Sequence, residues 1–269
     1  MGSGIAQVAA QAGNDVLLND RAPEYIERGL AVITKNLNRS FEKGKLDASE
    51  RDFILARIHP HPELNGLDVD IAIEAATEQL ETKLELFRTL DAVTPEKTIL
   101  ASNTSSISIT LLGGATNRGE RVIGMHFMNP VPVMQLVEII RGIATSQETY
   151  DFTESLAKQM GKTPVEVRDF PGFVSNRVLM PMINEAIYAL YEGVGSVEAI
   201  DTVMKLGMNH PMGPLTLADF IGLDTCLAIM DVLYDGFADS KYRPCPLLKQ
   251  YVAAGWLGRK SGRGFYTYA

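Results

Sequence analysis

The segment MGSGIAQVAAQAGNDVLLND, residues 1–20, joins a glycine-rich start to a helix pattern and a short strand pattern. Apolar residues recur at helical spacing from Ile5 to Ala12, and Gly13 is the type of residue that commonly ends a helix. Residues 16–18 form an apolar run typical of a short buried strand, and Asp20 follows it. The segment therefore predicts a helix, a tight turn and a strand that ends at an acidic residue.

Strand and helix patterns go on alternating as far as residue 167. The expected strands cover residues 69–74, 98–101, 122–127, 136–140 and 164–167, and the expected helices cover 23–43, 81–92 and 145–161. Such alternation predicts an α/β domain of Rossmann type with a mainly parallel sheet. Residues 171–269 carry helical stripes with no convincing strand pattern. We therefore expect a Rossmann-type domain over residues 1–170 and an all-helical C-terminal domain over 171–269.

The order glycine, helix, strand, acid is also that of a dinucleotide-binding turn, whose helix N-terminus holds the pyrophosphate while the acid binds the ribose. Asp20 lies 18 positions beyond Gly2, which fits if Gly2 is the last glycine of G-x-G-x-x-G. The first strand and the first two glycines would then precede Met1, so the domain is expected to lack its first strand in this chain. Asp20 favours NAD because a carboxylate repels a 2′-phosphate, while Arg21 leaves NADP possible. A small-residue helix start without any nucleotide is the alternative.

Candidate catalytic residues lie on either side of a proline-rich turn. His126 is near the end of the expected strand 122–127, and Glu138 is the one charged residue of the strand 136–140. If these strands pair antiparallel about the turn, the two side chains fall nearly opposite. A carboxylate beside an imidazole fixes its tautomer, as in a general base that removes a proton from an alcohol. A buried histidine in a structural ion pair is the alternative.

Two further polar groups are candidates for holding a ligand. The run from Ser102 to Ser106 follows a buried strand at its expected carboxyl end, where α/β sheets bind ligands; a turn with a helix cap is the alternative. Asn176 stands near the start of the first helix of the C-terminal domain, where it can face a cleft between domains.

Positive charge gathers on one expected helix in an otherwise acidic chain. Lys35, Arg39 and Lys43 recur every four residues, and Lys45 follows. This face is a candidate dock for phosphate groups, such as a nucleotide tail on a substrate. A solvated helix face is the alternative.

Composition excludes several kinds of partner. The 269 residues include 25 Lys+Arg and 33 Asp+Glu, for a formal net charge of −8, so we expect neither nucleic acid nor an anionic membrane as a partner. No apolar run reaches the ~18 residues of a membrane span. Cys226 and Cys245 lie outside any CxxC or Cys/His cluster, so we expect reduced thiols, no metal site and a cytoplasmic location. His59 and His61 alternate with prolines, which predicts an extended surface loop.

Six motifs together resemble the short-chain L-3-hydroxyacyl-CoA dehydrogenases, in particular the bacterial members that act on 3-hydroxybutyryl-CoA. The resemblance covers essentially the whole chain, and several long motifs in the right order are highly specific. The motifs are MGSGIAQ (1–7), ILASNTSSISIT (99–110), VIGMHFMNPVPVMQLVEII (122–140), PGFVSNR (171–177), HPMGPLTLADFIGLD (210–224) and AGWLGRKSGRGFY (254–266).

The resemblance implies reversible NAD(P)-dependent oxidation of (S)-3-hydroxybutyryl-CoA to acetoacetyl-CoA, in fatty acid and butanoate metabolism. It implies that His126 is the general base, that Glu138 is its carboxylate partner, and that Ser105 and Asn176 hold the reacting oxygen. It also implies a homodimer or higher homo-oligomer formed through the helical domain. The implied NAD contacts are Gly2, Asp20, Glu78, Lys83, Ser105, Asn129 and Lys260, and the implied coenzyme A contacts are Asn36, Arg39 and Lys43. The family normally begins with a strand and the complete glycine turn, and this chain departs from that pattern.

Three alternatives remain at this point. A sugar-acid or polyol dehydrogenase of the same fold would not need the basic face at residues 35–45. A non-catalytic nucleotide-binding protein would not need the set Ser105, His126, Glu138 and Asn176. The third alternative is that the chain is a part of a longer fatty-acid oxidation protein.

Overall fold

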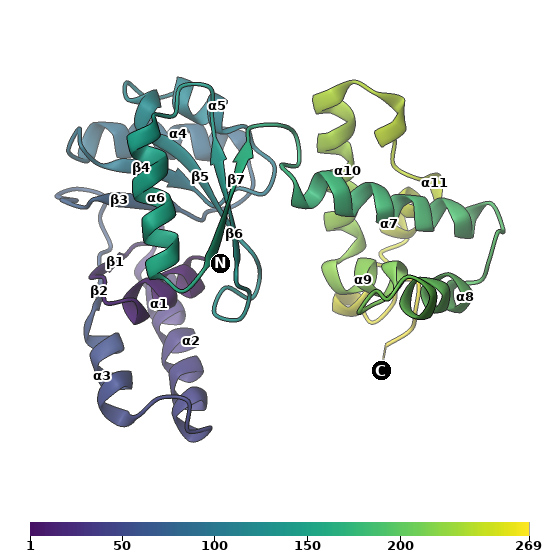
Figure 1. Ribbon diagram of the computed structural model, residues 1–269, viewed down its shortest axis with the longest axis horizontal. Coiled ribbons are helices and arrows are strands. Elements are labelled where there is room, and N and C mark those ends of the chain that lie inside the picture. Colours follow the sequence, from purple (N-terminus) through teal and green to yellow (C-terminus); the bar gives the residue numbers. More distant parts are fainter. Residues whose placement is uncertain (269) are drawn as a thin grey trace. The chain divides into compact units, whose positions relative to one another are not determined.

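The computed structural model describes residues 1–268, which form two compact units (Figure 1). The first unit is Met1–Asp169 and the second begins at Phe170. The first contains both sheets, and the second is built from helices.

The first unit holds two separate β-ladders. A two-stranded parallel sheet joins β1 (Val16–Leu18) to β2 (Ile58–Pro60), and a five-stranded sheet has the order β3-β4-β5-β6-β7. The strands of the larger sheet are β3 (Ile71–Glu74), β4 (Ile99–Ser102), β5 (Val122–Phe127), β6 (Leu136–Arg141) and β7 (Thr163–Arg168). All neighbours in it are parallel except β5 and β6. This mainly parallel sheet confirms the predicted α/β class.

Helices follow most strands of this unit, as expected for parallel connections. The helices of this unit are α1 (Gly2–Gln11), α2 (Pro23–Glu42), α3 (Ala48–Ala56), α4 (Leu80–Val93), α5 (Ile109–Gly114), the 3₁₀ turn η1 (Gly119–Arg121) and α6 (Gln147–Gln159).

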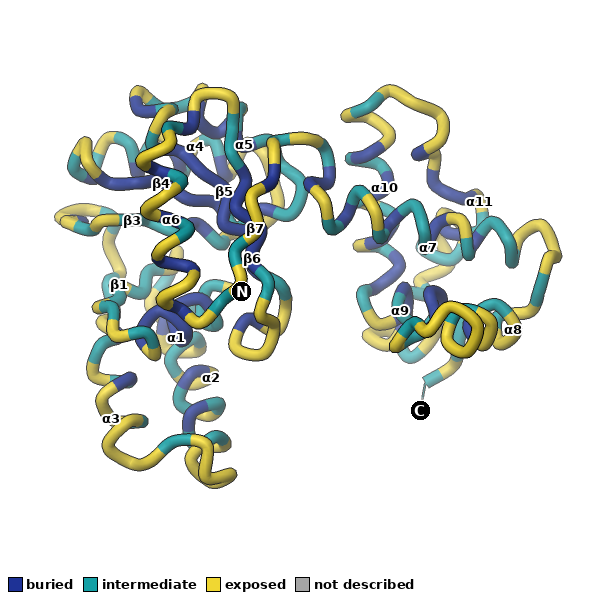
Figure 2. The backbone as a smooth tube through the Cα atoms, viewed as in Figure 1, coloured by how far each residue is buried: buried dark blue, intermediate teal, exposed yellow. Residues whose placement is uncertain are grey.

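Helices pack on both faces of the five-stranded sheet because successive side chains of a strand point to opposite faces. On one face, α1 and α6 pack over a core that includes Ala101, Met125 and Ile139. On the other, Gly124 of β5 lies so close to Ile109 of α5 that a Cβ there would be 3.0 Å from its Cδ1. The middle strands β4 and β5 are dark blue in Figure 2, and every residue of both is buried.

Residues 58–60 correct the expectation of an extended surface loop. They form β2, in which His59 pairs with Leu17, while His61 follows the strand and its Nε2 lies 3.1 Å from the Asn65 carbonyl. The strand is only three residues long and ends in Pro60, which has no N–H for a ladder. Helices α3 and α5 were also not predicted.

The second unit is a group of packed helices. Its elements are α7 (Ser175–Tyr191), α8 (Val197–Thr202), the π-helical turn η2 (Val203–Gly207), α9 (Pro214–Ile221), α10 (Leu223–Phe237), the 3₁₀ turn η3 (Ser240–Tyr242), α11 (Pro246–Ala253) and the 3₁₀ turn η4 (Arg259–Ser261). Its core takes side chains from four helices, such as Ile187 of α7, Leu215 of α9, Leu233 of α10 and Leu248 of α11. Up to Tyr268 the only β-structure in it is a pair of isolated bridges at Arg263.

The sequence pattern predicts one helix over residues 216–233, but the structure has two. Gly222 separates α9 from α10 with a φ of 104°, a conformation that disfavours residues with a side chain. Through Tyr268, no helix is both long and apolar enough to cross a membrane.

Candidate active site

A histidine and a glutamate face each other across the antiparallel pair of strands. In the register of β5 and β6, His126 is directly opposite Glu138, which confirms the predicted geometry. The His126 Nδ1 lies 2.8 Å from the Glu138 Oε2, and the two residues are 6% and 2% exposed. An ionised carboxylate only accepts hydrogen bonds, so a Glu138 carboxylate would hold a ring proton on Nδ1 and leave Nε2 on the side of Ser105. The pair has the geometry of an oriented general base.

Ser105 extends this pair into a chain of three side chains. Its Oγ lies 3.0 Å from the His126 Nε2. Ser105 belongs to the loop that follows β4, and β4 is parallel to β5. The loop is therefore at the carboxyl edge of the parallel strands, as expected from the sequence. A ligand oxygen that reaches Nε2 would also be within reach of the Ser105 hydroxyl.

Glu78 holds the Ser105 loop in place. Its Oε1 accepts hydrogen bonds from the backbone N–H of Ser105 at 2.9 Å and of Ser106 at 3.0 Å, and from the hydroxyls of Thr104 and Ser106. Burial raises the pKa of the Glu78 carboxyl, but the hydrogen bonds from residues 104–106 and the charge of Lys83 outweigh it and hold that pKa below its ordinary value. In the structure Glu78 thus holds residues 104–106 together through hydrogen bonds to its Oε1, and its Oε2 lies 3.5 Å from the Lys83 ammonium.

Lys83 is almost wholly buried and paired with Glu74, a residue that the sequence analysis did not identify. The Lys83 Nζ donates to the Glu74 Oε1 at 2.7 Å, and both side chains are at most 1% exposed. The other Glu74 oxygen accepts from the Ser102 hydroxyl at 2.6 Å. The signal was present, since Glu74 is a charged residue at the end of an otherwise apolar strand. This buried network joins β3, β4 and α4 beneath the loop.

Asn103 is a second residue to which the sequence analysis gave no role of its own, although it lies within the predicted run from Ser102 to Ser106. Its side-chain oxygen accepts a hydrogen bond from the backbone N–H of Phe127 at 2.9 Å. This contact fixes the start of the loop to the end of β5, one residue beyond His126. Asn129, a predicted NAD contact, lies on the next loop, between β5 and β6.

Two predicted nucleotide residues, Gly2 and Asp20, lie at the start of α1 and just beyond β1. Gly2 opens this helix, and a Cβ at Gly2 would lie 3.8 Å from the Ala75 Cβ. Asp20 lies just beyond β1 and is exposed, with one oxygen accepting from the Arg21 backbone N–H. The Arg21 guanidinium donates to the Tyr25 hydroxyl at 2.8 Å and lies over the Tyr25 ring. The Asp20 carboxylate is thus open to solvent at the position expected for a ribose partner.

The predicted coenzyme A residues lie on or next to α2. Lys35 and Arg39 are exposed on α2, while Lys43 is its C-cap residue and Lys45 follows. None of these cations lies within 4.0 Å of a carboxylate in the described part of the chain. Asn36 is turned toward α1, where its amide donates to the Gln7 Oε1 at 3.2 Å. The basic face is thus accessible to a phosphate group.

Two predicted site residues belong to the second unit. Asn176 lies in the first turn of α7 and is 9% exposed. Lys260 lies in η4, and its Nζ is 2.6 Å from a carboxylate oxygen of Asp224. Over residues 1–268, no group of three or more His, Cys, Asp and Glu side chains is arranged to hold a metal ion.

Comparisons with known proteins give the same family over both units. Residues 1–170 match the family model "3-hydroxyacyl-CoA dehydrogenase, NAD binding domain", and residues 172–268 match "3-hydroxyacyl-CoA dehydrogenase, C-terminal domain". The chain is 64% identical to a probable 3-hydroxybutyryl-CoA dehydrogenase of Bacillus subtilis, with 100% of this chain and 94% of the relative covered. It is 42% identical to the human mitochondrial hydroxyacyl-coenzyme A dehydrogenase, with 100% and 88% covered.

A solved structure agrees with the sequence relatives. The (S)-3-hydroxybutyryl-CoA dehydrogenase PaaH1 from Ralstonia eutropha superposes with a TM-score of 0.98 at 52% identity, with 100% of this chain and 95% of that chain covered. The family models, the relatives and this structure each extend over nearly all of the sequence. The chain belongs to the 3-hydroxyacyl-CoA dehydrogenase family.

Proposed function

We propose that this chain catalyses the reversible NAD-dependent oxidation of (S)-3-hydroxybutyryl-CoA to acetoacetyl-CoA. The observation that carries the proposal is the chain of contacts from Ser105 through His126 to Glu138 at the carboxyl edge of the parallel strands. The relatives named 3-hydroxybutyryl-CoA dehydrogenase at 50–64% identity support the substrate. They do not favour the sugar-acid or polyol alternative.

In this proposal His126 moves the proton. In the oxidation, the substrate hydroxyl gives its proton to the His126 Nε2, and the Glu138 carboxylate stabilises the imidazolium that forms. The Ser105 hydroxyl holds the reacting oxygen next to Nε2, and Asn176 is proposed as a second donor to that oxygen. In the reduction of acetoacetyl-CoA, the protonated His126 returns the proton to the oxygen.

The residues around α1 fit NAD. The first turn of α1 contains only small residues, Gly2, Ser3 and Gly4, so its N–H groups can approach a pyrophosphate closely. The exposed Asp20 carboxylate accepts hydrogen bonds from a ribose and disfavours a 2′-phosphate. NAD supplies the hydride acceptor when bound. Glu78, Asn129, Lys83 and Lys260 are proposed to contact or support it, Lys83 from its buried position under the loop.

The exposed cations Lys35, Arg39 and Lys43 are proposed to attract the phosphates of coenzyme A, with Asn36 beside them. We also propose that the protein is a homodimer formed through its second unit, and that it works in the cytoplasm. Cys226 and Cys245 are buried thiols outside any disulfide in the described chain, which supports a reducing compartment.

The test is acetoacetyl-CoA-dependent oxidation of NADH by this chain, with NADPH in parallel. We expect turnover with NADH and a much lower kcat/KM with NADPH. Free acetoacetate is the matched control, because it carries the same keto group without the nucleotide tail. Equal rates with acetoacetate would contradict the coenzyme A proposal, and a folded chain that oxidises NADH with neither compound would contradict the function.

A further inference from the structure

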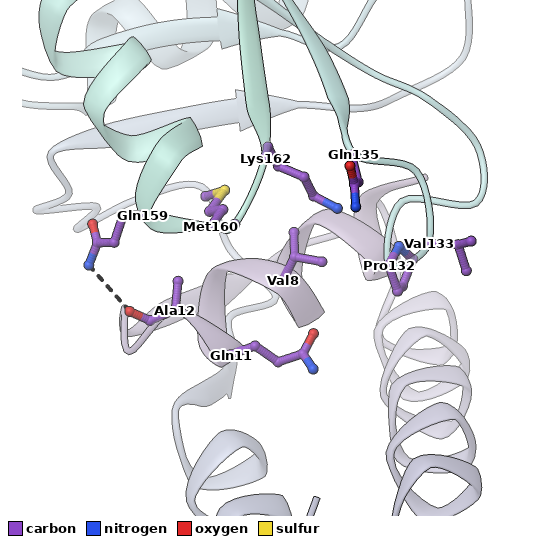
Figure 3. A pocket seen from close by; sticks show the side chains of 10 residues that line it. Val8, Gln11, Ala12, Pro132, Val133, Gln135, Gln159, Met160 and Lys162 are labelled. Atoms are coloured by element: carbon purple, nitrogen blue, oxygen red, sulfur yellow. Dashed lines mark hydrogen bonds between the residues drawn. The ribbon is translucent and has the colours of Figure 1, made fainter. Parts of the chain in front are cut away.

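A lysine outside the predicted site is bonded to the loop that joins the two catalytic strands. The loop comprises residues 128–135, between β5 with His126 and β6 with Glu138. The Lys162 Nζ donates to the carbonyl oxygens of Val131 at 2.6 Å and of Met134 at 2.9 Å. Figure 3 shows Lys162, from the turn before β7, among the side chains that line a pocket. The pocket has a volume of about 410 Å³ and is also lined by Gln135, Pro132 and Val8.

The lysine acts here as a donor to the backbone and not as half of an ion pair. Within residues 1–268, no carboxylate lies within 4.0 Å of its ammonium. The side chain is partly buried, and burial lowers the pKa of Lys162. Because a buried charge needs hydrogen-bond partners, the two loop carbonyls and the ammonium stabilise each other. On this side the Gln135 carbonyl also accepts a hydrogen bond from the Thr163 N–H at 2.8 Å, while Val133 is 71% and Met134 41% exposed.

The inner side of the same loop touches the first turn of α1. Val131 is 2% exposed, and a Cβ on Gly4 would lie only 3.0 Å from the Val131 Cβ. Asn129 lies on the loop itself. The loop thus carries Asn129 and contacts the first turn of α1, and both are proposed to contact the cofactor. His126 is held separately, by Glu138 and Ser105.

We propose that Lys162 is a positioning residue for the cofactor, because its ammonium fixes the 128–135 loop against the first turn of α1. This inference rests on the proposed function. Without the two hydrogen bonds, the loop moves more freely, and the position of Asn129 relative to the turn at Gly2–Gly4 is no longer fixed. The affinity for NADH falls, while proton transfer by His126 continues once the cofactor is bound.

The test compares Lys162→Met, Lys162→Arg and Lys158→Met. Methionine keeps the length of the side chain but has no donor, so we expect the KM for NADH to rise about tenfold while kcat changes less than about twofold. Arginine keeps the charge and the donors and should recover most of the affinity. Lys158 is the matched control, because it lies at the end of α6, is exposed, and its ammonium pairs with the partly exposed side chain of Glu154 on the same helix.

Hydrogen exchange measures the loop independently of activity. The N–H groups of Val133 and Met134 both donate to the Pro130 carbonyl, so we expect both to exchange faster in K162M than in the wild-type chain or K158M. If K162M does not fold, Lys162→Gln, with a shorter amide donor, should show a smaller change of the same kind. Unchanged exchange, or faster exchange with an unchanged KM for NADH, would overturn the inference. Inactivity of the wild-type chain would instead overturn the proposed function, and the exchange experiment would still test the contact.

Discussion

At the scale of single residues, the proposed mechanism makes one nitrogen of His126 transfer the proton. His126→Asn removes that nitrogen and keeps a polar side chain of similar size. General acid–base catalysis contributes about 10²–10⁴-fold, so we expect kcat to fall by that factor while the KM for acetoacetyl-CoA changes only a few-fold. Steady-state kinetics measure both. His59→Asn is the matched control, since His59 is exposed on β2, and a similar loss in that variant would argue against the role of His126.

Glu78 predicts a pH dependence of stability. Its pKa lies below the ordinary value of 4.5, so its contribution to the free energy of unfolding is full above pH 4.5 and is lost as the pH falls through the lowered folded-state value. Glu78→Gln is expected to cost about 1 kcal/mol at pH 7, a small figure because the side chain is 40% exposed.

Urea unfolding of the wild-type chain and E78Q between pH 3 and pH 8 measures this difference. The gap between the two proteins should be constant above about pH 5.5 and should shrink below pH 4.5. A gap that stays constant down to pH 3 would mean that the Glu78 charge does not stabilise the loop.

Residue-scale prediction from sequence works where two partners lie on neighbouring strands. The proximity of His126 and Glu138 follows from two strand patterns and one turn, because register then fixes which residues are opposite. The Glu74–Lys83 pair joins a strand to the helix after it, and no periodicity specifies that Lys83, the one lysine of α4, turns inward. The three hydrogen bonds from residues 108–110 to Asp169, which join the end of β7 to α5, were unpredictable for the same reason.

At the scale of elements, the pairing of β5 with β6 depends on one glycine. A Cβ at Gly124 would lie 2.8 Å from the Ile140 Cβ and 3.0 Å from the Ile109 Cδ1, so Gly124→Ala forces β5, β6 and α5 apart. We expect a loss of about 1–3 kcal/mol in the free energy of unfolding, as for other overpacked cores. Since His126 is two residues further along β5, kcat should fall as well.

Gly114→Ala is the control for this change. Gly114 is the last residue of α5, and no atom lies within 4 Å of a Cβ placed there. Its stability should stay the same or rise slightly, because alanine favours a helix. Equal stability of G124A and the wild-type chain in urea unfolding would show that the sheet adapts to the extra methyl group.

Most long elements and the short strand β1 were predictable from the sequence, whereas β2, α3 and α5 were not. The expected strand 122–127 coincides with β5, and the expected strand 136–140 differs from β6 by one residue. Strand β2 reads Ile-His-Pro and buries only its first residue, so it lacks the apolar run by which the equally short β1 was recognised. Helix α3 did carry a signal, because Asp47 and Glu50 form a capping box at its start. The break at Gly222 depends on a single φ angle that propensity does not indicate.

At the scale of the whole molecule, the family was predictable because its motifs are spread along both units. The prediction of a Rossmann-type NAD-binding domain followed by a helical domain is confirmed by the two family models, which together match residues 1–170 and 172–268. The predicted membership of the 3-hydroxyacyl-CoA dehydrogenase family is confirmed by the same models, and relatives named 3-hydroxybutyryl-CoA dehydrogenase agree with it. Composition alone gave only expected exclusions, such as no nucleic acid partner from a net charge of −8.

The second unit leaves large apolar side chains exposed around α8, η2 and α9. Leu206 is 81% exposed, Val194 77% and Phe220 60%, and exposed apolar surface of this kind marks an association site. In a two-fold symmetric dimer, this surface of one subunit would pack against the same surface of the other, so that both copies would be covered. We therefore expect light scattering after gel filtration to give twice the 29.4 kDa chain mass.

Leu206→Glu should shift the protein toward the monomer, whereas Ile143→Glu, at a 90% exposed position of the first unit, should not. A wild-type monomer at micromolar concentration, or an unshifted L206E, would contradict this surface as the interface.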